Sequence, residues 1–131
     1  MQGNLKVSLS DASIAGEFTI FLFNVRTVTH MLHLNTRSMA QHLALDEFYK
    51  SITELADRFA ESSIGHFGAI TWPETIGDGL VIATDPVVYL RQVKTGGEKA
   101  ITLTQPEDLL GILDEILELT TKTLYKLTNL E

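Results

Sequence analysis

The chain has 131 residues, 44% of them hydrophobic and 21% charged, which is long enough for one core and short for two ordinary domains. We therefore expect a single domain over residues 1–131. The formal net charge of −7 argues against a basic nucleic-acid-binding surface. The absence of cysteine rules out disulfides and thiolate metal sites, so any metal must be bound by His, Asp, Glu and water.

The sequence offers no targeting or membrane-spanning segment. Residues 1–11 have neither the basic start nor the apolar centre of a secretion signal. The most apolar run, residues 18–25, is too short to cross a bilayer. We expect a cytoplasmic protein with no membrane partner.

A first helix is predicted over residues 13–34, where Ser10 or Asp11 can cap its start. Its apolar residues recur at helical spacing: Ile14, Phe18, Phe21, Leu22, Val25, Val28, Met31 and Leu32. The polar segment 33–38 predicts a break.

A second helix is predicted over residues 39–63, with its own apolar stripe: Leu45, Phe48, Ile52, Leu55 and Phe59. The glycines and proline between residues 65 and 79 then predict a long irregular loop.

Residues 80–103 allow two interpretations. Asp85 and Pro86 favour the start of a short helix, whereas the β-branched residues around 95–98 would suit a hairpin. A last helix is better marked, because residues 104–107 read TQPE, a capping box, and leucines at helical spacing follow. The chain is thus predicted to be mainly all-α, a helical bundle.

The second predicted helix has a polar face as well as an apolar one. With His42 at zero, Asp46 falls at ~40°, Asp57 at ~60° and Glu61 at ~100° around the helix, while the apolar stripe lies at ~220° to 300°. Eleven residues separate Asp46 from Asp57, about 16 Å along the axis, so one helix cannot close a single site from both pairs. Two copies paired antiparallel about a twofold axis can do so, and the geometry predicts a dimer with two equivalent sites.

The polar face of the second predicted helix allows two interpretations, a helix–helix contact or an ordinary surface. Tyr49, Thr53, Ala56 and Ala60 form a seam of mostly small residues, through which two helices could approach. The alternative is an ordinary solvated surface, in which Lys50 and Arg58 balance the acids.

His30, the sequence HLALD at 42–46 and the sequence DRFAE at 57–61 resemble the Dps family, a branch of the ferritin-like proteins, over residues 20–63. The resemblance implies a ferritin-like four-helix bundle with a shortened or irregular third helix region. It further implies an intersubunit ferroxidase centre that oxidises Fe(II) with O2 or peroxide, for iron storage and protection against oxidative stress. By motif position His30, His42 and Asp46 are one half-site, and Asp57 and Glu61 of a second copy are the other, around non-haem iron in a di-iron arrangement.

Several features depart from that family. Met31 stands where the family commonly has Trp, and the third helix region is short. No basic N-terminal tail is present, so DNA binding is not expected. The resemblance also implies a twelve-subunit shell, and the small size is similar to that of phage-encoded proteins.

Other residues and functions compete with this interpretation. His33 lies three residues from His30 and could join a metal site, but it is interpreted as a polar residue at a helix end. His66 is interpreted as exposed. Glu17 and Glu54 could flank a centre within one subunit, but no Glu-x-x-His pair accompanies them. The alternative functions are a non-catalytic interaction or structural bundle, and a non-redox Zn or Mn site, because imidazole and carboxylate do not select iron alone.

Overall fold

The computed structural model describes residues 11–77 and 82–130. Within these ranges the chain forms four helices and no strand: α1 (Asp11–Asn35), α2 (Met39–Phe67), α3 (Pro86–Leu103) and α4 (Glu107–Asn129). The predicted all-α bundle is confirmed. Ser10, proposed as a helix cap, lies outside the described residues.

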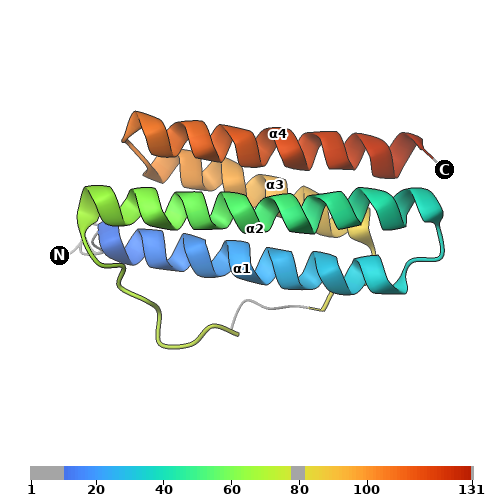
Figure 1. The fold of residues 1–131 in the computed structure, drawn as a ribbon, viewed down its shortest axis with the longest axis horizontal. Coiled ribbons are helices and arrows are strands. Elements are labelled where there is room, and N and C mark those ends of the chain that lie inside the picture. Colours follow the sequence, from blue (N-terminus) through green and yellow to red (C-terminus); the bar gives the residue numbers. More distant parts are fainter. Residues whose placement is uncertain (1–10, 78–81, 131) are drawn as a thin grey trace.

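The four helices lie side by side with their axes roughly aligned (Figure 1). α2 packs along both α1 and α4, α4 also packs along α3, and α1 touches α3 more lightly. The chain reverses direction from α1 to α2 and again from α3 to α4, whereas α2 and α3 run the same way (Figure 1). The bundle is therefore two antiparallel hairpins joined by one long crossover.

The turn between α1 and α2 is short and well capped. The Ser38 hydroxyl accepts a hydrogen bond from the Gln41 backbone N at 3.2 Å, which satisfies one of the free N–H groups of the α2 start. The predicted break is thus confirmed, though it covers only residues 36–38. α2 runs four residues further than predicted and ends at Gly68, whose φ of 85° favours glycine.

The crossover after α2 leads back along α1. The Thr71 N–H donates to the Ala12 carbonyl at 3.2 Å, and the Asn24 side-chain amide donates to the Ile76 carbonyl at 3.1 Å. Gly16 permits this approach, since a Cβ there would lie 2.1 Å from the Thr71 carbonyl oxygen. The loop predicted over residues 65–79 is irregular from 68 to 77, and its residues 78 and 79 lie outside the described chain.

Residues 86–103 form a helix, so the hairpin alternative is wrong. The Asp85 carboxylate accepts from the backbone N of Val87 and of Val88 at 2.9 and 3.2 Å, and Pro86 occupies the first turn. Gly96 and Gly97, in the middle of the segment that would have suited a hairpin, serve helix packing instead. A Cβ on Gly96 would lie 2.6 Å from the Phe21 ring, and one on Gly97 would lie 2.9 Å from Leu117.

The capping box predicted for α4 does not form. Pro106 stands at the cap position with no side-chain hydrogen bond, and the Thr104 hydroxyl donates instead to the Ala100 carbonyl at 2.8 Å. The threonine therefore ends α3 rather than starting α4.

The core lies where the apolar stripes of all four helices meet. The α2 stripe is buried as predicted, with Leu45, Phe48 and Ile52 fully inaccessible. Partner side chains from the other helices are likewise buried: Leu22, Val25, Leu90, Leu109, Leu113 and Ile116. No helix among the described residues is long and apolar enough to cross a membrane.

Candidate functional site

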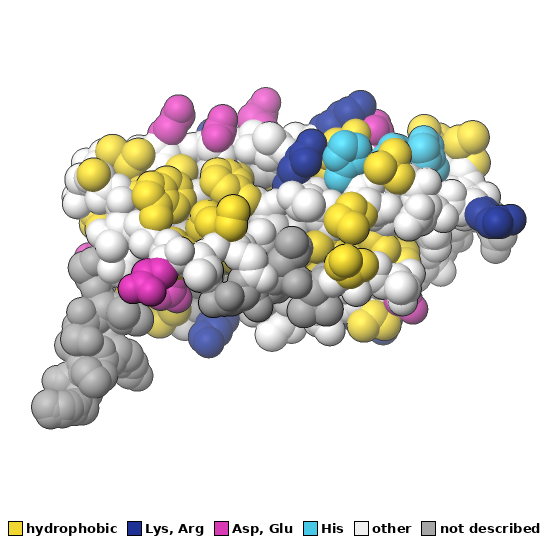
Figure 2. Space-filling model, turned by 90° about the horizontal axis from the view of Figure 1, so that it is seen from below, with side chains coloured by type: hydrophobic (Ala, Val, Ile, Leu, Met, Phe, Trp, Pro, Cys, Tyr) yellow, Lys and Arg dark blue, Asp and Glu magenta, His cyan; other side chains and the backbone are white. Residues whose placement is uncertain are grey.

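The outward face of α2 carries four of the five predicted site residues. His42 and Asp46 are half-buried near the start of the helix, and Asp57 and Glu61 are exposed near its end. Figure 2 shows histidines with Lys and Arg side chains toward the right of the upper edge, and a group of Asp and Glu toward the left. The two ends of this edge thus differ in charge.

A pair of histidines joins α1 to α2 at the end near the turn. The His33 Nδ1 lies 2.9 Å from the His42 carbonyl oxygen, and the His42 Nδ1 lies 3.2 Å from the His33 carbonyl oxygen. The rings stack with centroids 3.9 Å apart. Because a carbonyl oxygen can only accept, each Nδ1 must carry the proton, and in the neutral ring each Nε2 then holds the lone pair.

Asp46 faces this pair and a lysine. Its Oδ1 lies 3.9 Å from the His33 Nε2, and its Oδ2 accepts from the Lys50 Nζ at 3.0 Å. The Lys50 hydrogen bond holds the pKa of Asp46 below its usual value. Asp46 is therefore ionised at neutral pH, with one oxygen paired.

His30 is half-buried and stands slightly apart from the other two histidines. Its ring stacks on Tyr49 at 4.1 Å between centroids, and the Arg26 guanidinium lies 5.6 Å from the same tyrosine ring. The His30 and His33 rings are 6.0 Å apart. The structure thus gathers His30, His42 and Asp46 at one end of the α1–α2 hairpin, with His33 between them.

Asp57 and Glu61 lie away from that group. Both are exposed, and within the described parts of the chain neither forms a hydrogen bond or ion pair. No group of three or more His, Asp or Glu among the described residues could hold a metal by itself. As predicted, His42 and Asp46 near the start of α2 are therefore too far from Asp57 and Glu61 near its end to form one site within a single chain.

The remaining sequence candidates fall outside this cluster. Glu17 and Glu54 are exposed. His66 is exposed as predicted, and its Nε2 lies 2.7 Å from the Asp108 Oδ1 on α4. The predicted small-residue seam is only partly at the surface, because Ala56 is fully buried in the subunit's own core.

His33 lies in the last turn of α1, the helix end where it was expected. The sequence did not predict its burial: it is only 7% exposed and packs among the site residues. The signal was its place relative to the turn: His33 and His42 flank residues 36–38 at similar distances, so a tight hairpin brings them together.

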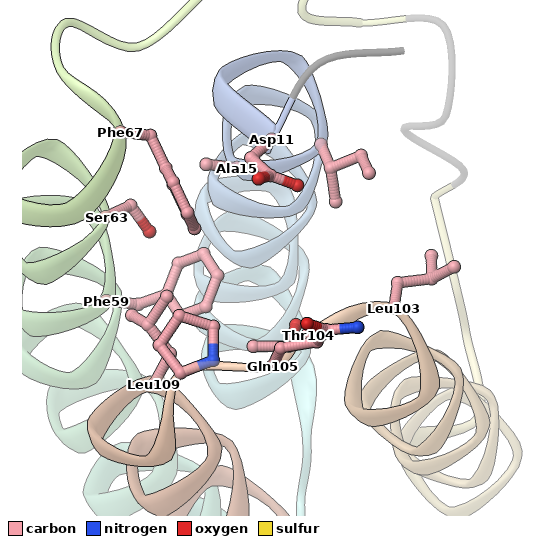
Figure 3. A pocket seen from close by; sticks show the side chains of 11 residues that line it. Asp11, Ala15, Phe59, Ser63, Phe67, Leu103, Thr104, Gln105 and Leu109 are labelled. Atoms are coloured by element: carbon pink, nitrogen blue, oxygen red, sulfur yellow. The ribbon is translucent and has the colours of Figure 1, made fainter. Parts of the chain in front are cut away.

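A cavity of about 570 Å³ lies at the opposite end of the bundle, among the ends of all four helices (Figure 3). Phe59, Ser63 and Leu109 line it, and Asp11 is the one ionisable residue among the described residues of its lining. The Ser63 hydroxyl is buried without a hydrogen-bond partner within the described residues. No histidine is among its described lining residues, so they do not offer the imidazole and carboxylate donors found near the start of α2.

Comparison with known proteins identifies a family that covers the chain from the end of α1 onward. A family model described as "Family of unknown function (DUF5856)" matches residues 33–127, which is most of the chain. The chain belongs to this family. The DUF5856 match begins at His33 and includes both halves of the α2 face, while His30 lies before it.

The chain is also similar to a protein of Enterobacteria phage T4, named "Uncharacterized 14.6 kDa protein in mobD-ri intergenic region". The two are 26% identical over 104 residues, which cover 79% of this chain and 80% of the phage protein. No solved structure matches this DUF5856 chain.

Proposed function

We propose that this protein binds Fe(II) between two copies of the chain and oxidises it, at a site built from the outward face of α2. The observation that carries the proposal is the placement of His42 with Asp46, and of Asp57 with Glu61, on one face about three turns apart. An antiparallel second copy would bring each imidazole end to an acidic end, with His30 beside it.

The hydrogen bonding of His42 supports this proposal. Its Nδ1 donates to the His33 carbonyl, so the neutral ring offers Nε2 to a cation. Histidines that bind metals commonly donate their other ring N–H to a carbonyl or carboxylate, which fixes the ring orientation. The donor set fits a hard or borderline cation.

The negative charges of the carboxylates on α2 also support the proposal. In the antiparallel register Asp46 of one copy faces Asp57 of the other, and two carboxylates brought together repel unless a cation lies between them. Asp57 and Glu61 are exposed and can reach such an ion without burying an unpaired charge. A bound Fe(II) would relieve the repulsion.

The topology is also compatible with the proposal. A four-helix bundle with a single long crossover is the connectivity of ferritin-like folds, and here one crossover joins the parallel helices α2 and α3. Fold alone does not give a function, so the proposal depends on the site residues.

The proposed chemistry is a one-electron loss from each of two Fe(II) ions. One hydrogen peroxide takes both electrons with two protons and becomes two waters, and O2 is the other oxidant that the resemblance implies. Carboxylates tolerate the rise in charge from ferrous to ferric iron. The protein's part is to place the carboxylates and imidazoles around the substrate ions.

One observation favours a second function. Lys50 already neutralises Asp46, as expected of a solvated face in a non-catalytic interaction or structural bundle. A non-redox Zn or Mn site would use the same ligands without turnover.

The test compares the natural chain with an Asp57→Asn/Glu61→Gln variant. Fe(II) is added anaerobically, binding is measured by calorimetry, and peroxide or O2 is then mixed in while ferric absorbance is followed. We expect the variant to lose about tenfold or more in Fe(II) affinity and in oxidation rate.

The matched control is Asp114→Asn/Glu118→Gln, which removes two exposed acids at the same spacing on α4. Equal binding and oxidation in all three proteins would contradict the proposal. Binding of Zn(II) or Mn(II) with no Fe(II) oxidation would favour the non-redox alternative.

A further inference from the structure

His33 has no role in the proposed intersubunit centre, yet it is the most enclosed of the histidines at this end of the bundle. It is 7% exposed, its ring stacks on His42, and Tyr49 lies 5.4 Å away between centroids. These contacts fix the plane of the ring between α1 and α2.

The nitrogen that remains free can be assigned. The His33 Nδ1 donates to the His42 carbonyl at 2.9 Å, so the lone pair of the neutral ring is on Nε2. This nitrogen faces Asp46, whose Oδ1 is 3.9 Å away. A distance of 3.9 Å is too long for a hydrogen bond between the two atoms.

The same distance suits two ligands of one ion. Nitrogen and oxygen ligands lie ~2.1 Å from a divalent transition metal, so two of them on a common ion can be up to ~4.2 Å apart. His33 and Asp46 come from different helices, and the turn between them is short and capped. The pair is therefore placed before any ion arrives.

We propose that the His33 Nε2 and the Asp46 carboxylate bind one divalent cation within a single chain, with water completing the coordination. The mixture of imidazole and carboxylate suits Fe(II), Co(II) or Zn(II). The inference rests on the proposed function for the class of ion and shares Asp46 with it, but it needs no second copy.

Lys50 decides how tightly this site binds. Its ammonium holds Asp46 through Oδ2 at 3.0 Å, which leaves Oδ1 toward His33 but places a positive charge beside the ion. Like charges at such distances repel. Removing the Lys50 charge should therefore tighten cation binding, whereas removing either ligand should weaken it.

The experiment uses Co(II) as the probe, with affinity measured by calorimetry and coordination by visible absorption. All proteins carry Asp57→Asn/Glu61→Gln, so that the intersubunit centre lacks its acids. In this background we compare His33→Asn, Lys50→Gln and the control His66→Asn. The asparagine amide can still donate to the His42 carbonyl, so His33→Asn removes mainly the Nε2 ligand.

We expect the background protein and His66→Asn to bind Co(II) equally, His33→Asn to lose about tenfold or more in affinity, and Lys50→Gln to gain affinity. Equal binding by His33→Asn and the background protein would overturn the inference. Absence of Co(II) binding in the background protein, with binding in the natural chain, would also overturn it while leaving the intersubunit centre intact.

Discussion

At the scale of single residues, glycines mark where the backbone comes closest to its neighbours. Gly16 faces the crossover, where a Cβ would lie 2.1 Å from the Thr71 carbonyl oxygen and 3.0 Å from its carbon. Both atoms belong to the backbone, so they cannot rotate away as a side chain could. Gly111 in α4, by contrast, has nothing within 4 Å of an added Cβ.

We predict opposite effects for alanine at these two positions. Gly16→Ala should lower the free energy of unfolding by about 1–3 kcal/mol, because the crossover must move away from α1. Gly111→Ala should raise it by about 0.5–1 kcal/mol, because alanine is the better helix former. Urea unfolding measures both, and equal stabilisation by the two would show that the crossover does not lie against Gly16.

At the scale of elements, ion pairs tie α2 to α4. Arg58 donates to both oxygens of Glu115 at 3.0 and 2.9 Å, and Lys126 donates to Glu47 at 2.7 Å. Hydrogen bonds from these cations lower the pKa of Glu115 and of Glu47, and His66 does the same for Asp108. All three carboxylates lie at the surface, so screening limits what each contributes.

These shifts make the α2–α4 contact sensitive to acid. A carboxyl with a lowered pKa in the folded chain contributes stability above its unfolded pKa, and that stability is lost as the pH falls through the folded pKa. We predict that Glu115→Gln makes the fall of Tm below about pH 4.5 shallower than in the natural chain. Thermal unfolding from pH 7 to pH 3 measures it.

The control for that measurement is Glu118→Gln, an exposed acid on the same helix. Its slope of Tm against pH should match that of the natural chain. If Glu118→Gln and Glu115→Gln alter the slope alike, net charge rather than the Arg58 pair governs acid stability.

The elements show how far sequence reasoning extends. The α2 stripe was predictable because Leu45, Phe48 and Ile52 recur at helical spacing, and all three are buried. The helix over residues 86–103 was not predictable from its own sequence. Gly96 lies in it because the Phe21 ring of α1 approaches closely at that point, and this contact comes from another helix. The capping box failed for a similar reason, since Thr104 bonds backward to Ala100.

The candidate site was likewise only partly predictable from the sequence. Helix periodicity sufficed to place His42, Asp46, Asp57 and Glu61 on one face. The burial of His33 depends on the geometry of the turn, which periodicity does not describe. Whether the face binds a second copy depends on surfaces outside a single chain.

At the scale of the whole molecule, the proposed pairing has an apolar component. The antiparallel register that sets His42 opposite Glu61 and Asp46 opposite Asp57 also sets Met39 opposite Ile64. These two side chains are 69% and 46% exposed in the single chain. By the twofold symmetry the contact occurs twice, once at each end of the paired helices.

We predict that Ile64→Lys weakens the proposed dimer by about tenfold or more, since each contact loses the burial of an apolar side chain. Adding Met39→Glu to Ile64→Lys should restore pairing in part, because each lysine then meets a carboxylate. Native mass against concentration measures both. The control Leu103→Lys, at an apolar residue 50% exposed on α3, should leave the mass unchanged.

A monomeric natural chain would contradict this prediction and the shared centre together, but not the His33–Asp46 site. The two proposals can therefore fail separately.

The crossover between the two hairpins also bears on how the chain folds. Each hairpin closes through a turn of only three residues, 36–38 or 104–106, and such local closure is fast. Docking the hairpins instead requires contacts between distant segments, such as Arg58 of α2 with Glu115 of α4. We expect the hairpins to form first and the crossover to pack against α1 afterwards, so that slow hydrogen exchange at the Thr71 amide would report the docked crossover.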